Sequence, residues 1–149
     1  MTITTEKIYP YVFEFRRLRT SYDELKNDDG SGKYRDLHSL FFLRCYHFAD
    51  SLVASGLDKN LVYTFIRKSK HLSLCRDLAN TLKHKKPRGS IFNFGGFDPV
   101  SRHVDWFDGG VVKTCVHPVN QTFPMDAQEL AHQCLHEWED FLYTNDIKI

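Results

Sequence analysis

The middle of the chain brings together side chains of the types that act on phosphodiesters. Arg76, Asp77, Asn80 and His84 recur at helical spacing within one short segment. An α-helix turns by about 100° per residue, so the other three side chains would fall within about 100° of Arg76. The apolar residues of the segment fall on the opposite side. The sequence therefore predicts a polar ribbon with a guanidinium, a carboxylate, an amide and an imidazole.

These four residue types can divide the work of general acid–base catalysis. An imidazole exchanges a proton near neutral pH, which suits His84 to the role of acid or base. Arg76 can hold a phosphate through two parallel hydrogen bonds. Asn80 and Asp77 can orient the imidazole or a hydroxyl group. We therefore name all four as candidate catalytic residues. The simpler alternative is a solvated helix face on which Arg76 pairs with an acidic neighbour.

A basic run follows the ribbon directly. Its cations are Lys83, Lys85, Lys86 and Arg88, and Pro87 interrupts them. We predict that these four residues bind the phosphates of a nucleic acid. Cations at the C-terminal end of a helix also complement the helix dipole, which is the structural alternative.

Periodicity predicts the elements that would position these residues. Apolar residues recur at helical spacing in four stretches, the third in one or two pieces; the stretches are 5–26, 34–55, 60–86 and 124–143. The second is apolar around much of its circumference, so we expect a central helix packed on two sides. Between the last two stretches, 90–119 contains β-prone runs, including 111–116, and Asp108-Gly109-Gly110 favours a hairpin turn.

The predicted fold is therefore mainly α. We expect a four-helix, bundle-like core with a small antiparallel β-hairpin of two or three short strands inserted before the last helix. The length of 149 residues suits one domain. A formal net charge of +1 gives no general argument for a nucleic-acid coat. No apolar run approaches the roughly 20 residues that a membrane span needs, and the N-terminus lacks a secretory pattern. We expect a cytoplasmic protein without a membrane partner.

The cysteines and histidines predict no metal site and no cofactor. None of Cys45, Cys75, Cys115 and Cys134 stands at metal-ligand spacing from another along the chain. We expect free, buried thiols in a reducing compartment. His103, Asp105, Cys115 and His117 have the two-residue spacing of ligands on strands, but no second strong pair with finger-like spacing accompanies them.

The element order and the segment 74–84 together resemble the HEPN superfamily of small α-helical domains. Segment 127–138 also resembles the closing helix of bacterial and phage proteins with that layout. The resemblance implies a single HEPN-like domain over 1–149. Many members are metal-independent ribonucleases, in which an Arg–polar–His motif from each protomer of a dimer lines a shared cleft. Arg76, Asp77 and His84 match that motif, with seven residues between the arginine and the histidine.

The function expected from ribbon and resemblance is RNA cleavage or RNA binding in a bacterial or phage defence setting, by a homodimer. Two alternatives remain open. One is a non-catalytic interaction or scaffold module, for which Arg76 would be neutralised by Asp77. The other is a small-ligand-binding protein with a pocket under the hairpin, lined by Phe92, Phe94 and Trp106.

Overall fold

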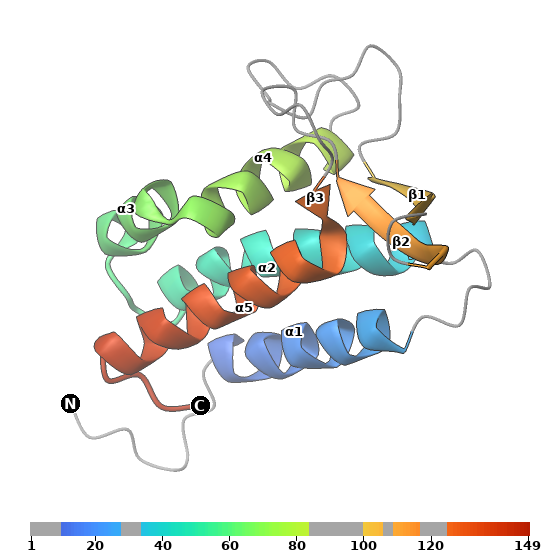
Figure 1. Ribbon diagram of the computed structural model, residues 1–149. Helices are drawn as coiled ribbons and strands as arrows, with labels where there is room; N and C mark the ends of the chain where they lie inside the picture. The colour runs from blue at the N-terminus through green and yellow to red at the C-terminus, as the bar shows by residue number, and fades with distance from the viewer. Residues whose placement is uncertain (1–9, 28–33, 84–99, 106–108, 117–124) are drawn as a thin grey trace.

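The structure is a computed structural model that describes residues 10–27, 34–83, 100–105, 109–116 and 125–149. Its helices pack side by side, and a small sheet lies at one end of them (Figure 1). The five helices are α1 (Pro10–Lys26), α2 (Tyr34–Ala54), α3 (Lys59–Lys68), α4 (Lys70–Lys83) and α5 (Ala127–Thr144). The three strands are β1 (Val100–Asp105), β2 (Val111–Val116) and β3 (Met125–Asp126). The predicted class, mainly helical with antiparallel strands before the last helix, is confirmed.

Helix α2 is the centre of the helical layer, as its apolar circumference predicts. It contacts each of the other four helices. Helix α4 runs antiparallel to both α2 and α5 (Figure 1). One cluster of buried residues takes members from all five helices and from β1 and β2. Fully buried aromatic side chains dominate it, among them Phe15, Phe48 and Trp138.

The predicted third helix is two helices in the structure, so the described residues hold five helices rather than four. Ser69 separates α3 from α4 in an extended conformation, with φ −86° and ψ 127°. Its backbone N–H and its hydroxyl both donate to the carbonyl of Phe65, at 3.0 and 2.7 Å, and so satisfy the last turn of α3. Helix α4 then begins at Lys70 and continues to Lys83. The remainder of the predicted stretch, 84–86, lies outside the described residues.

The sheet has the order β1-β2-β3, with both pairs antiparallel. In the hairpin Val100 lies opposite Val116, and Asp105 lies opposite Val111. The predicted strand 111–116 is confirmed. Gly109 and Gly110 precede it with φ of 65° and 80°, backbone values that favour glycine in a tight turn. The two-residue strand β3 pairs with the end of β2 and leads directly into α5.

Candidate functional site

Helix α4 positions three of the four candidate catalytic residues. Its buried side is formed by Leu72, Cys75, Leu78, Ala79 and Thr81. Arg76, Asp77 and Asn80 lie away from that side and are half-buried rather than fully exposed. The fourth candidate, His84, lies outside the described residues.

Arg76 and Asp77 form an ion pair with each other. The guanidinium Nε lies 3.4 Å from a carboxylate oxygen, and the side chains are 32% and 24% exposed. The pairing neutralises much of the charge that Arg76 would present to a phosphate. Partly exposed pairs of this kind contribute at most about 1 kcal/mol, so a phosphate can compete with Asp77 for the guanidinium.

Polar residues of α2 and α3 extend the surface beside this pair. Tyr46 is half-buried, and Arg76 and Asp77 are both near enough to act on its charge. Burial is the main cause that raises the pKa of Tyr46, and Asp50 acts in the same direction. Asp50 also accepts a short hydrogen bond from the hydroxyl of Tyr63. That hydrogen bond raises the pKa of Tyr63 to about 12. Polar residues of α2, α3 and α4 therefore lie near enough to influence one another electrostatically.

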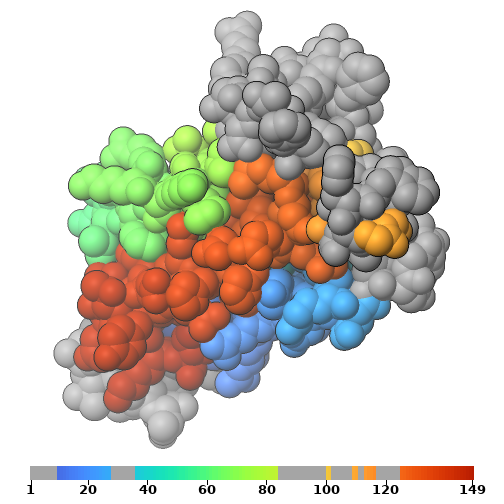
Figure 2. All heavy atoms as spheres, in the orientation of Figure 1, coloured from blue at the N-terminus to red at the C-terminus, as the bar shows by residue number. Residues whose placement is uncertain are grey.

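Positive charge is concentrated on α3, α4 and the residues that follow them. Segment 59–88 holds nine of the twenty Lys and Arg residues of the chain but one of its nineteen Asp and Glu residues. The exposed cations on the described part of this segment are Lys59, Arg67, Lys68, Lys70 and Lys83. Helix α1 also exposes four cations, Arg16, Arg17, Arg19 and Lys26, together with acidic residues. Helix α5, beside α3 and α4 in Figure 2, carries four acidic residues and no Lys or Arg. Segment 59–88 is therefore strongly basic and α5 is acidic, although the net charge of the chain is +1.

Of the four predicted phosphate-binding cations, only Lys83 is among the described residues. It is exposed in the last turn of α4. Lys85, Lys86 and Arg88 lie outside the described residues, so their predicted role stays a prediction. The exposed cations of α3 were not among the predicted phosphate-binding residues. The excess of Lys and Arg over Asp and Glu throughout segment 59–88 is the sequence feature that could have indicated them.

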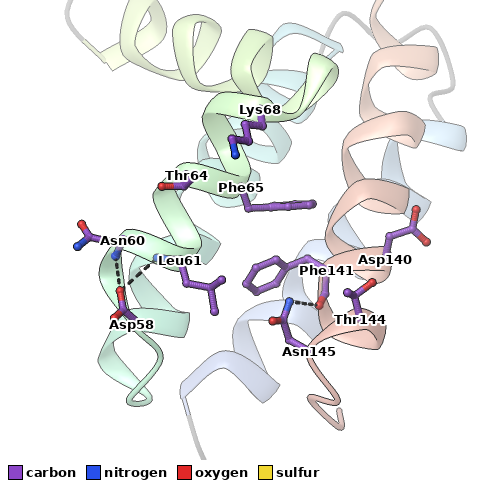
Figure 3. A pocket seen from close by; sticks show the side chains of 10 residues that line it. All are labelled: Asp58, Asn60, Leu61, Thr64, Phe65, Lys68, Asp140, Phe141, Thr144 and Asn145. Carbon is purple, nitrogen blue, oxygen red and sulfur yellow. Dashed lines mark hydrogen bonds between the residues drawn. The ribbon is translucent and has the colours of Figure 1, made fainter.

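An open groove of about 780 Å³ lies between α3 and the C-terminal end of α5 (Figure 3). Phe65 and Phe141 form its floor, with ring centroids 4.7 Å apart. Leu61 stands beside them and is 47% exposed. Asp58, Asp140 and Lys68 lie around the rim. The pocket expected under the hairpin would involve Phe92, Phe94 and Trp106, which lie outside the described residues.

Three cysteines from three helices meet in the core. Cys45 of α2, Cys75 of α4 and Cys134 of α5 are fully buried, and their sulfur atoms all lie within 4.8 Å of one another. The Cys75 thiol donates to the carbonyl of Phe42 and the Cys134 thiol to that of His71, each at 3.4 Å. The expectation of buried thiols is confirmed. Their convergence was not predicted, because it depends on where the helices cross.

The three thiols differ in acidity. Burial raises the pKa values of Cys75 and Cys134 well above the usual range. Burial acts on Cys45 in the same way, but side-chain interactions with Cys134, Cys75 and Trp138 outweigh it and lower the pKa of Cys45 to about 5.

No family model, curated protein or solved structure matches this chain. Among the described helices, none has both the length and the apolar character needed to cross a membrane.

Proposed function

We propose that this protein binds RNA through the surface of α3 and α4, as a HEPN-like domain of a bacterial or phage defence setting. The concentration of positive charge in segment 59–88 carries the proposal. Lys and Arg side chains that neutralise phosphates release counterions, and this release drives sequence-independent binding. The acidic α5 would repel the same backbone and so restrict the RNA to one side of the molecule.

We propose RNA binding, rather than RNA cleavage, as the main function. Arg76 is paired with Asp77 at 3.4 Å, and seven residues separate it from His84 in the sequence. In the catalytic form of the proposal, RNA phosphate replaces Asp77 at the guanidinium, His84 acts as acid or base, and Asn80 orients a hydroxyl. Incubation of RNA with wild-type protein and with His84→Ala, both in chelator, separates the two forms. Cleavage by wild type alone supports catalysis.

The proposed homodimer also rests on the resemblance to HEPN domains. It predicts a particle of twice the chain mass in sedimentation analysis. A dimer formed along α4 would place two cationic surfaces side by side.

The binding test is a salt titration of a fluorescently labelled single-stranded RNA. Lys70→Ala/Lys83→Ala removes two exposed cations from α4, while Arg16→Ala/Lys26→Ala removes two exposed cations from α1. We expect the α4 variant to bind more weakly. The slope of the logarithm of the association constant against the logarithm of the salt concentration should fall in magnitude by up to about 1.4. Each contact with a single-strand phosphate contributes about 0.7, and the variant lacks two cations. The α1 variant should retain the wild-type slope.

Absence of RNA binding at low salt, or equal losses in the two variants, contradicts the proposal. The alternative of an interaction or small-ligand-binding module would then take precedence. The groove between α3 and α5 favours that alternative, because it is open, has a floor of Phe65 and Phe141, and exposes the apolar side chain of Leu61.

A further inference from the structure

The three buried sulfur atoms are already arranged like the ligands of one ion. Zinc–sulfur bonds are about 2.3 Å long, so three sulfurs in a trigonal plane around an ion of that size stand about 4.0 Å apart. The sulfurs of Cys45, Cys75 and Cys134 all lie within 4.8 Å of one another. Shifts of a few tenths of an ångström would bring them onto a common centre. Each comes from a different helix, so the three cysteines are held there by the packing of α2, α4 and α5.

Because the cluster offers three sulfur ligands, it favours a soft ion with a low coordination number. Thiolate ligands favour Cu(I), Zn(II) and iron–sulfur clusters over hard cations. Among the described residues, no His, Asp or Glu side chain joins the three sulfurs. Structural zinc sites are almost always four-coordinate, and a fully buried cluster offers little room for water as a fourth ligand. A monovalent ion bound by three sulfurs fits these constraints better.

We propose that Cys45, Cys75 and Cys134 bind one monovalent copper ion in the helical core. Each thiol that becomes a thiolate ligand releases its proton to solvent, and the copper stays in the monovalent state throughout. Because the cluster joins three helices, the bound ion links α2, α4 and α5 and stabilises the folded chain by mass action.

The fourth cysteine provides a matched control. Cys115 is also buried, but it lies on β2 and is not a member of the cluster. The test uses the full chain, reduced and free of oxygen, with Cu(I) buffered by a copper chelator. Copper is added both to folded protein and during refolding, because the site is closed to solvent. Bound copper per chain is measured after desalting, and the number of sulfur neighbours is measured by X-ray absorption.

We expect one copper with three sulfur neighbours in wild type and in Cys115→Ala. Cys45→Ala, Cys75→Ala and Cys134→Ala should bind at least about tenfold more weakly and show fewer than three sulfurs. Circular dichroism verifies that each variant is folded, and Cys75→Ser repeats the test with a side chain closer in size. Bound copper should raise the melting temperature of wild type and of Cys115→Ala, but not that of the three cluster variants.

Three results would overturn the proposal. The first is no copper bound by wild type under either protocol. The second is a three-sulfur site that survives in any cluster variant or is lost in Cys115→Ala. The third is Zn²⁺ that displaces Cu(I) in direct competition, which would assign the cluster to a different ion.

Discussion

At the scale of single residues, both local and tertiary contacts occupy the charged groups near the polar ribbon of α4. Arg76 is paired with Asp77, and Asp50 is engaged by Tyr63 from a different helix. The polar ribbon of α4 is therefore half-buried and partly neutralised. Exposed cations lie near this ribbon on α3 and at the two ends of α4, and others lie on α1. This distribution favours an electrostatic contact surface over a preorganised catalytic centre.

The Tyr63–Asp50 contact predicts a specific pH dependence. The pKa of Tyr63 is raised from 10.0 to about 12, first by the hydrogen bond to Asp50 and then by burial. The protonated hydroxyl therefore stabilises the folded protein fully below pH 10, and this contribution is lost as the pH rises toward 12. We expect Asp50→Asn to lower the pKa of Tyr63 toward its usual value. The measurement is a pH titration of tyrosinate absorbance. The Tyr63 step is the part of the titration that Tyr63→Phe removes, and it is compared between wild-type protein and Asp50→Asn.

Tyr143→Phe is the control for that titration, because Tyr143 is an exposed residue at the end of α5. This substitution should leave the Tyr63 step in place. An unchanged midpoint for Tyr63 in Asp50→Asn would show that the hydrogen bond does not cause the shift.

At the scale of elements, the helix ends are secured by both local and distant side chains. Asp58 and Asp126 cap α3 and α5 by accepting hydrogen bonds from backbone N–H groups of the first turn. Gly56, with φ of 105°, closes the C-terminus of α2. The N-terminus of α4 differs, because its cap comes from another helix. The carboxylate of Glu137 on α5 accepts hydrogen bonds from the backbone N–H groups of His71 and Leu72, at 3.1 and 2.9 Å.

This distant cap predicts a stability effect. Glu137→Ala leaves two half-buried N–H groups without their acceptor and should lower the free energy of unfolding by about 2 kcal/mol. Glu139→Ala, on the same helix, loses only an exposed pair with Arg19 at 3.9 Å and should cost less than about 0.5 kcal/mol. Urea unfolding measures both. Equal costs for the two variants would refute a capping role for Glu137.

At the scale of the whole molecule, one aromatic core connects helices that are distant in the sequence. Trp138 lies against Phe48 of α2, with ring centroids 5.0 Å apart and the rings nearly perpendicular. It also packs against Phe65 of α3. Its indole N–H donates to the carbonyl of Cys45 at 3.0 Å. Trp138 thus joins α2, α3 and α5 beside the thiol cluster.

Substitution at this junction should affect the whole fold. Trp138→Phe removes a buried hydrogen bond and part of the packing, so we expect a loss of about 1 to 3 kcal/mol in the free energy of unfolding. Phe13→Ala, at a site that is 49% exposed on α1, should cost less than about 0.5 kcal/mol. Thermal unfolding followed by circular dichroism measures both. A Trp138→Phe variant as stable as wild type would show that the Trp138 hydrogen bond and packing do not contribute to the stability of the core.

The sequence by itself determined the secondary structure wherever the signal is local. The apolar repeat of α2 and the β-prone run 111–116 were predicted with bounds close to those observed. Such patterns are local because burial of one face imposes a period of 3.6 on a helix and of 2 on a strand. The break at Ser69 was harder to place, because apolar periodicity continues on both sides of it.

Only the tertiary structure decided which of these faces meet. Cys45, Cys75 and Cys134 each occupy an ordinary position on an apolar stripe, and nothing in their spacing along the chain indicates that they converge. The groove between α3 and α5 and the Glu137 cap are equally invisible in the sequence. The reason is physical: periodicity specifies which face of a helix is buried, but the angle and register at which helices cross depend on side-chain packing across the whole core.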